Sequence, residues 1–318
     1  MILSRRSLPR PFAVCCKSAN PFGSLGLKNR YRYLLGMGVG FGFPENIMSR
    51  KFSAMSGGLD ERIAFGKELL RVQTETFARH FGKVESQWKS DGSRVTEADL
   101  AISKSIETQL SDRFHDDLFL SEELDQDSSP ISVSRRFAWL VDPIDGTNNF
   151  ARGIPSCSIS VALLEEGRPV YGFIYDHMSR SVFDGGPGKG VFADGQERRI
   201  SNSPPSAQSI VGTQHCQMDR SFNDDRALQS RYKIRNFGSS AIQLAYVAVG
   251  LMDGVIAHKV KTWDVAAGIA MLEAAGGSLH YFVPNPFPLS SFDLSSEPFG
   301  YLAASPALCQ AMIEATGH

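Results

Sequence analysis

The sequence has few of the features that would link it to nucleic acid, a membrane or a disulfide framework. Its 33 Lys and Arg nearly balance 34 Asp and Glu, so the net charge of −1 provides no broad positive field for a nucleic acid or an anionic membrane. No apolar run approaches the roughly 20 residues that span a bilayer. The five cysteines form no C-x-x-C pair or zinc-spaced cluster, which favours a reducing compartment. We therefore expect a cytoplasmic protein with no nucleic-acid or membrane partner.

The basic residues are concentrated at the N-terminus. Residues 1–51 contain nine Lys or Arg and one acid, a charge of +8 that leaves −9 for residues 52–318. Many Gly and Pro residues and few acids are typical of a targeting segment. We expect residues 1–55 to be a disordered or targeting leader, or the result of an upstream start codon with Met48 or Met55 as the true start. Residues 56–318 would form one domain, and a targeting leader would make an organelle the alternative location.

Hydrophobic periodicity predicts alternating helices and strand pairs in residues 56–318. Apolar residues at helical spacing predict a helix over 59–81, and Thr96-Glu97-Ala98-Asp99 is a capping box that opens a second helix. Strands are expected at 137–141, 157–164, 170–175, 253–257, 278–282 and 300–304, and further helices at 239–249, at 264–275 and from 306 onward. The alternation indicates a layered α/β (α+β) sandwich rather than one doubly wound parallel sheet.

Two aspartates follow the strand expected at 137–141. Asp142 and Asp145 lie in a proline-stiffened turn that can direct both carboxylates to one point. Converging carboxylates repel unless a cation lies between them, and oxygen ligands without His or Cys indicate a hard ion such as Mg²⁺. Gly146 and Thr147 then offer backbone N–H groups to a phosphate. Taken alone, the segment is equally typical of a turn with no catalytic role.

Further acids lie where other elements begin or end. Glu122 and Glu123 follow a short apolar run, Asp264 begins a helix, and Asp99 is the last residue of the capping box. Each has an ordinary explanation as a solvated loop charge or a helix cap. We interpret them together as one acidic metal site, because four separate explanations are a weaker account than one shared site.

Two segments of the sequence resemble a known family. WLVDPIDGTNNF at 139–150 and WDVAAG at 263–268, preceded by Glu122-Glu123, closely resemble the signature segments of the inositol monophosphatase family in order and spacing. The resemblance covers the chain from about Leu59 to the C-terminus. It implies an αβαβα sandwich shared with fructose-1,6-bisphosphatase, and Mg²⁺-dependent hydrolysis of a phosphate monoester.

The resemblance also implies metal and catalytic roles for individual residues. Two or three Mg²⁺ ions per active site are expected. The implied ligands of the first are Glu122, Asp142 and the Ile144 carbonyl, and those of the second are Asp142, Asp145 and Asp264. Thr147, with Asp99 accepting its hydroxyl proton, resembles the pair that activates the attacking water, and Glu122 is counted with them as catalytic.

Substrate contacts are implied in the same way. Gly146 and Thr147 would bind the phosphate through their N–H groups, and Ser239 and Ser240 would bind the alcohol. Lys89 matches a lysine of a mobile loop near the first metal, a loop made flexible by Asp91-Gly92. An exposed loop lysine is the alternative interpretation.

The alcohol part of the substrate is left open by Ala257. This alanine stands where inositol-hydrolysing members carry a glutamate, and its side chain cannot accept a hydrogen bond. His258, Lys259 or Lys261 is an alternative source of a hydrogen-bond donor, and a solvated loop is the simpler interpretation of these three residues. Inositol 1-phosphate is the default substrate. The alternatives are histidinol-phosphatase or 3′(2′),5′-bisphosphate nucleotidase activity and, further away, a regulatory partner of the transcription or ribosome-assembly machinery. The family also implies a homodimer.

Overall fold

The computed structural model describes residues 58–89, 94–124, 129–214 and 220–318. The predicted leader and the Asp91-Gly92 loop lie outside these residues. Within them the helices are α1 (Leu59–His80), α2 (Glu97–Arg113), α3 (Thr147–Ala151), α4 (Arg220–Gln229), α5 (Ser240–Ala248), α6 (Thr262–Ala274) and α7 (Pro306–Thr316). None of these described helices is long and apolar enough to cross a membrane.

The described strands form two main sheets and two small pairs. The seven-stranded sheet has the order β10 (Gln196–Arg198), β9 (Gly190–Ala193), β8 (Ser181–Gly186), β7 (Arg168–Asp176), β6 (Ser158–Glu165), β5 (Phe137–Asp145), β3 (Leu118–Ser121). The five-stranded sheet has the order β12 (Lys233–Arg235), β11 (Ile210–Gln214), β13 (Gly254–Val260), β16 (Phe299–Ala304), β14 (Ser278–Tyr281). The pairs are β1 (Ser86–Trp88) with β2 (Arg94–Thr96), and β15 (Ser291–Phe292) with β4 (Ile131–Ser132).

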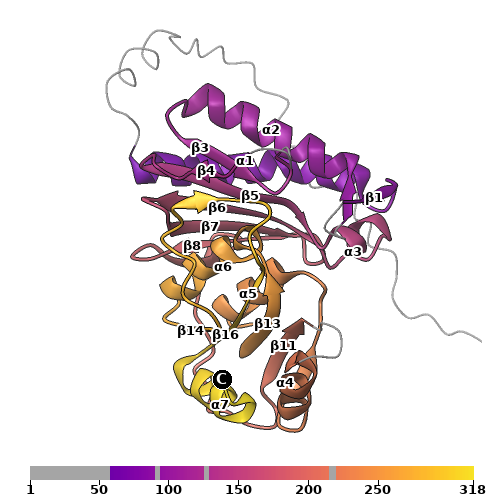
Figure 1. Cartoon of the computed structure of the whole chain (residues 1–318), viewed down its shortest axis with the longest axis vertical. Coiled ribbons are helices and arrows are strands. Elements are labelled where there is room, and N and C mark those ends of the chain that lie inside the picture. The colour runs from indigo at the N-terminus through magenta and orange to yellow at the C-terminus, as the bar shows by residue number, and fades with distance from the viewer. Residues whose placement is uncertain (1–57, 90–93, 125–128, 215–219) are drawn as a thin grey trace, which may run out of the picture. The chain divides into compact units, whose positions relative to one another are not determined.

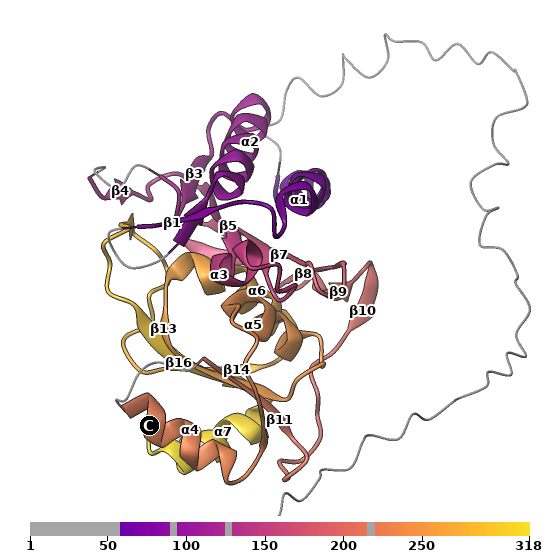
Figure 2. The ribbon, with the colours of Figure 1, turned by 90° about the vertical axis from the view of Figure 1, so that its right-hand side faces the viewer.

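The helices and sheets of residues 58–318 alternate in five layers. Helices α1 and α2 cover one face of the seven-stranded sheet, and α5 and α6 lie between that sheet and the five-stranded one (Figures 1 and 2). Helices α4 and α7 cover the outer face of the five-stranded sheet (Figure 2). The order is helix, sheet, helix, sheet, helix, so the predicted αβαβα sandwich is confirmed.

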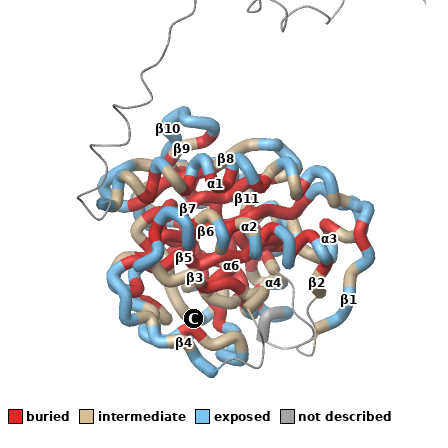
Figure 3. Tube along the Cα trace, turned by 90° about the horizontal axis from the view of Figure 1, so that it is seen from above, coloured by how far each residue is buried: buried red, intermediate tan, exposed pale blue. Residues whose placement is uncertain are grey.

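Burial follows from each element's place in these layers. Outer helix α1 buries only one face, with Ile63, Leu70 and Phe77 at helical spacing, whereas inner helix α6 is buried almost all round. Strand β5 has helices over both faces and is buried at all nine positions. Figure 3 shows this contrast, with buried strands beneath helices whose outer surfaces are exposed.

Strand β5 runs further than the sequence predicts. The expected end at Val141 is wrong, because pairing with β6 resumes at Asp145 after a register shift that begins at Asp142. Pro143 lies inside the shift, where its missing N–H costs no ladder hydrogen bond. Both aspartates are therefore held at the end of a buried strand rather than in the turn expected after it.

Candidate active site

The acidic residues converge from four elements at one edge of the seven-stranded sheet. Strands β3 and β5 are parallel neighbours, so the residues that follow β3, Glu122 and Glu123, lie beside Asp142 near the end of β5. Asp264 and Asp99 are each the third residue of a helix, α6 and α2. The convergence expected from the sequence is what the structure contains.

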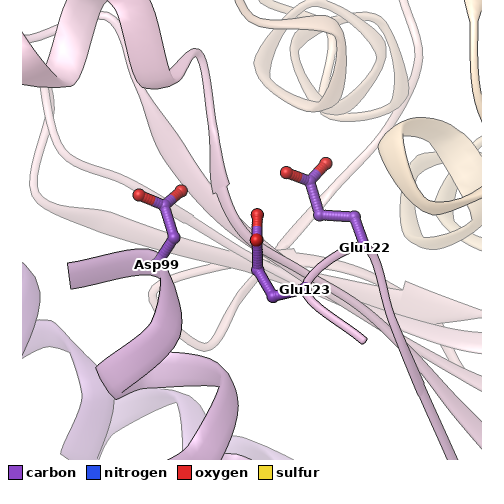
Figure 4. A group of neighbouring side chains, drawn as sticks. All are labelled: Asp99, Glu122 and Glu123. Carbon is purple, nitrogen blue, oxygen red and sulfur yellow. The ribbon is translucent and has the colours of Figure 1, made fainter. Parts of the chain in front are cut away.

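These carboxylates form two overlapping groups. In one group, oxygens of Glu122, Asp142 and Asp264 all lie within 4.8 Å of one another, and in the other the same holds for Asp99, Glu122 and Glu123. Figure 4 shows Asp99 extending from the first turn of α2, and Glu122 and Glu123 from the loop after β3. Glu122 belongs to both groups and links them into one acidic centre.

Asp145 is held separately by a set of hydrogen-bond donors. Its Oδ2 accepts from the Ser239 hydroxyl at 2.6 Å and from the Ala241 backbone N–H at 2.7 Å. Burial raises the pKa of Asp145 to about 6, although these hydrogen bonds oppose the shift. The Ser239 hydroxyl, which is predicted to contact the substrate, therefore donates its hydrogen bond to Asp145 and orients that carboxylate.

The charges at this centre fit a divalent cation. Burial, followed by the negative charges of neighbouring carboxylates, raises the pKa of Asp142 and Asp264 well above the ordinary value. Among the described residues, no Lys or Arg forms an ion pair with Asp142, Asp145 or Asp264. Buried carboxylates without a cationic partner are costly, and hard oxygen ligands suit Mg²⁺. The donor set therefore matches the predicted ion.

Lys89 forms ion pairs with two carboxylates of this centre. Its Nζ lies 3.1 Å from Glu122 Oε1 and 2.6 Å from Glu123 Oε1, and only 9% of its side chain is exposed. Burial lowers the pKa of Lys89, but the two glutamates outweigh that effect and hold it above its usual value. Burial raises the pKa of Glu123 above its ordinary value, the hydrogen bond to Glu122 and the charge of Glu122 add to this shift, and Lys89 opposes it. The exposed-lysine interpretation is therefore wrong.

We expect Lys89→Met to destabilise the metal-free protein. The substitution leaves Glu122 and Glu123 without their cation, and breaking a buried pair costs about 3 kcal/mol. Lys104→Met is the matched control, because Lys104 pairs with Glu107 on an exposed helix face and should change the free energy of unfolding by less than about 1 kcal/mol. Urea unfolding of both variants measures the difference, and equal losses would contradict a buried ion pair at Lys89.

Gly146 and Thr147 form the turn that follows β5. Gly146 has a φ of +88°, and a Cβ there would lie 3.1 Å from the carbonyl oxygens of Gly238 and Ser156. Only glycine fits this left-handed conformation so close to backbone. Thr147 opens the short helix α3 and lines the same cleft as the carboxylates.

Gly146→Ala is expected to lower the free energy of unfolding by more than the strain of a left-handed alanine alone. That strain is about 1 to 3 kcal/mol, and the two carbonyl contacts add to it. Gly188→Ala separates the backbone strain from the effect of the close carbonyl contacts, because Gly188 also has a positive φ but no atom lies within 4 Å of its Cβ position. Thermal unfolding should rank Gly146→Ala as the less stable variant; the reverse order would show that the close approach is unimportant.

The predicted pair of Thr147 and Asp99 is not hydrogen-bonded in the structure. The Thr147 hydroxyl donates to the Ile144 carbonyl at 2.9 Å, while Asp99 Oδ2 accepts from the backbone N–H and hydroxyl of Thr96 at 2.7 and 2.5 Å. The capping box thus occupies one oxygen of Asp99, and its buried Oδ1 has no partner. Burial raises the pKa of Asp99 to about 7.

A cleft of about 520 Å³ opens beside the acidic centre. Of the predicted residues it is lined by Glu122, Asp142, Ile144, Asp145, Gly146, Thr147 and Asp264, with Gly238 beside them. Sequence reasoning missed its other lining residues: Trp88, Arg94, Asn148, Arg152 and Gln214. Arg94 lies 4.0 Å above the Trp88 ring. The hydrophobic pattern gave no signal for these residues, although Arg94 lies only two residues after Asp91-Gly92 in the sequence.

The basic residues after Ala257, which are His258, Lys259 and Lys261, are not among the residues that line the cleft. His258 lies 3.8 Å from Asp224, and successive strand residues point to opposite faces, so it is turned away from the face that Ala257 occupies. The Lys261 ammonium donates to the Leu294 carbonyl at 3.3 Å. Neither His258 nor Lys261 lines the cleft, so the structure gives no support to the suggestion that either supplies a donor to the substrate.

Sequence comparisons extend over nearly all of the described residues. A model of the inositol monophosphatase family matches residues 59–315. The fructose-1,6-bisphosphatase/inositol-1-monophosphatase of Thermotoga maritima is 30% identical over 225 residues, which cover 70% of this chain and 85% of that protein. Inositol monophosphatase 1 of Solanum lycopersicum is 28% identical, with coverage of 82% and 97%. The Nus factor SuhB of Xylella fastidiosa is 31% identical, with coverage of 63% and 74%.

Solved structures share the same fold. The extragenic suppressor protein suhB of Bartonella henselae superposes with a TM-score of 0.70 at 26% identity, covering 80% of this chain and 98% of that one. The Thermotoga maritima IMPase superposes with a TM-score of 0.69 at 25% identity, covering 81% and 97%. Fold and sequence relationships therefore agree.

Proposed function

Because the chain belongs to the inositol monophosphatase family, whose members hydrolyse phosphate monoesters, we propose that it is a Mg²⁺-dependent phosphatase of a small polar alcohol phosphate. Inositol 1-phosphate is the substrate we expect first. The observation that carries the proposal is the convergence of Glu122, Asp142 and Asp264, three carboxylates from three elements, at a cleft.

The proposed metal ligands are all backbone or carboxylate oxygens. Glu122, Asp142 and the Ile144 carbonyl would hold one Mg²⁺, and Asp142, Asp145 and Asp264 a second. When bound, such ions lower the pKa of water and neutralise charge on the phosphate oxygens. Asp142 has the central place, because its carboxylate belongs to both sets. The backbone N–H of Ile144 donates to its Oδ1 at 3.0 Å and keeps it oriented.

Proton transfer is assigned to Thr147 and Asp99. For this role the Thr147 hydroxyl must give up its bond to the Ile144 carbonyl, pass its proton to Asp99 Oδ1, which has no hydrogen-bond partner, and accept a proton from the attacking water. A base of this kind contributes about 10²- to 10⁴-fold. The N–H groups of Gly146 and Thr147 orient the phosphate. Lys89 partly neutralises the negative charge of Glu122 and Glu123.

A substrate panel tests the proposed function. Purified protein with Mg²⁺ is offered inositol 1-phosphate, fructose 1,6-bisphosphate, histidinol phosphate and adenosine 3′,5′-bisphosphate, and phosphate release is measured. We expect inositol 1-phosphate to give the highest kcat/KM. A higher value for histidinol phosphate or the nucleotide would replace the proposed substrate by one of the alternatives, which neither the site nor the comparisons favour. No release from any of the four would count against a phosphatase.

Three further proposals concern the whole chain. We propose that residues 1–55 are a leader outside the catalytic domain of residues 56–318, that the domain forms a homodimer, and that it acts in the cytoplasm. N-terminal sequencing of the mature protein tests the leader, since a mature start at or after residue 48 is expected. Light scattering tests the dimer, which a mass near 34.8 kDa for the full chain would contradict.

A further inference from the structure

The backbone segment in front of helix α5 is joined to helix α3 by side-chain hydrogen bonds. Asn149 on α3 donates through Nδ2 to the Phe237 carbonyl at 2.9 Å and to the Ser156 carbonyl at 2.8 Å. The Ser156 hydroxyl donates to the same Phe237 carbonyl at 2.7 Å. One backbone oxygen therefore accepts two hydrogen bonds, from side chains that lie 81 and 88 positions earlier in the sequence.

The two segments are also in close backbone contact. Gly238 has a φ of +69°, and a Cβ at this position would lie 2.8 Å from Asn149 Nδ2. The Cβ position of Gly146 lies 3.1 Å from the Gly238 carbonyl oxygen. Both distances leave no room for a side chain, so the turn after β5 and the segment before α5 pack backbone to backbone. The Asn149 amide lies within this contact.

The segment before α5 leads directly into the donors that hold Asp145. Ser239, two residues after Phe237, is the N-cap of α5, and its hydroxyl donates to Asp145 Oδ2 at 2.6 Å. The Ala241 N–H donates to the same oxygen at 2.7 Å. Asp145 and Asn149 lie four residues apart on the run from β5 into α3. This run therefore bonds to residues 237–241 at two points, once through a carboxylate and once through an amide.

We propose that Asn149 is a positioning residue for the second Mg²⁺, acting on Asp145 through Ser239 and Ala241. The inference rests on the proposed phosphatase function and its metal ligands. Asn149 fixes where residues 237–241 lie, and the two donors in that segment set the direction of the Asp145 carboxylate. Removing a hydrogen-bonded partner of a metal ligand typically costs about 10- to 100-fold in metal affinity or activity.

Asn149 should act on ion binding rather than on the substrate. It is not among the residues that line the cleft, whereas its neighbours Thr147 and Asn148 are. A change at Asn149 is therefore expected to raise the Kd for Mg²⁺ and to leave the KM for the substrate nearly unchanged once Mg²⁺ is saturating. A residue that only stabilised the fold would lower Tm and leave the Kd for Mg²⁺ unchanged.

Isothermal titration calorimetry of Mg²⁺ into the full chain, freed of metal by EDTA and dialysed, tests this inference without relying on activity. Asn149→Leu keeps a side chain of similar size but has no donor, and it should raise the Kd for Mg²⁺ by about 10-fold or more. In phosphate release from inositol 1-phosphate, the Mg²⁺ concentration at half-maximal rate should rise by a similar factor. The KM for inositol 1-phosphate at saturating Mg²⁺ should change by less than about twofold.

Two further variants make the test specific. Tyr171→Phe is the matched control, because it also removes a buried hydrogen bond, from the Tyr171 hydroxyl to Asp184 at 2.5 Å, at residues that do not line the cleft. It should lower Tm without changing the Kd for Mg²⁺. Ser156→Ala removes the other side-chain donor to Phe237 and leaves Asn149 in place, so it should raise the Kd by a smaller factor, about threefold.

The outcomes separate this inference from the function on which it rests. An unchanged Kd in Asn149→Leu, or in Ser156→Ala where Asn149→Leu does not fold, would overturn the positioning role and leave the phosphatase in place. An equal rise in Tyr171→Phe would do the same. If wild type binds Mg²⁺ but releases no phosphate, the proposed function fails and calorimetry still decides the role of Asn149. A wild type that binds no Mg²⁺ would overturn both.

Discussion

Asp142→Asn is expected to lower kcat by at least about 10²-fold while the fold is retained. The amide has nearly the size of the carboxylate but removes the one charge shared by both proposed metal sets. Because Asp142 is buried among like charges, removing its charge relieves repulsion rather than breaking an ion pair. Steady-state phosphate release at saturating Mg²⁺ measures the loss, and circular dichroism checks the fold.

Two companion variants make this prediction specific. Asp264→Asn should cause a similar loss, because Asp264 lies in the same carboxylate group. Asp194→Asn is the control: Asp194 is exposed, has a φ of +50° that asparagine tolerates, and accepts a hydrogen bond from the Val182 N–H that an amide oxygen can also accept. Near-wild-type turnover in both Asp142→Asn and Asp264→Asn would contradict the two-ion assignment.

The second large effect concerns stability and pH. Burial raises the pKa of Asp145 to about 6 and that of Asp99 to about 7, against an ordinary value of 3.8. The folded state therefore holds these protons more tightly than the unfolded state. Their stabilising contribution is complete below about pH 4 and is lost as the pH rises through 6 and 7. The metal-free protein should accordingly be destabilised at neutral pH by its own acidic centre.

Mg²⁺ should reverse this loss, because it binds the ionised folded state. At one hundred times its Kd, an ion stabilises by about 2.7 kcal/mol, which for a domain of this size raises Tm by about 5 °C or more. Thermal scans with EDTA or Mg²⁺ should show a larger Mg²⁺-induced rise at about pH 7.5 than at about pH 5. In Asp142→Asn the rise should shrink. An equal rise at both pH values would mean that Mg²⁺ binds elsewhere.

Sequence reasoning succeeds here where the information is local. Asp99 and Asp264 are third residues of helices, and Asp142 follows five apolar residues of strand β5, so each position can be read from a few neighbours. Convergence then follows from topology, because parallel strands β3 and β5 end at the same edge. The layered fold was predictable for the same reason, since helices and strand pairs alternate along the chain.

What the sequence could not reveal depends on non-local contacts. Strands β8 to β12 are short or rich in glycine and polar residues and carry weak hydrophobic patterns. Gln214 ends one of them, and its position beside Ala257 exists only once two distant strands pair. The burial of Lys89 likewise comes from Glu122 and Glu123, more than 30 residues away in sequence.

Phosphate release from inositol 1-phosphate, measured as Mg²⁺ is added back to EDTA-treated protein, tests the central claim most directly. The claim is that the buried carboxylates around Asp142 hold the ions that make this cleft a phosphatase. The prediction is no release without the ion, and a saturable return of activity that Asp142→Asn fails to show. Release that persists after chelation, or that returns equally in Asp142→Asn, would contradict it.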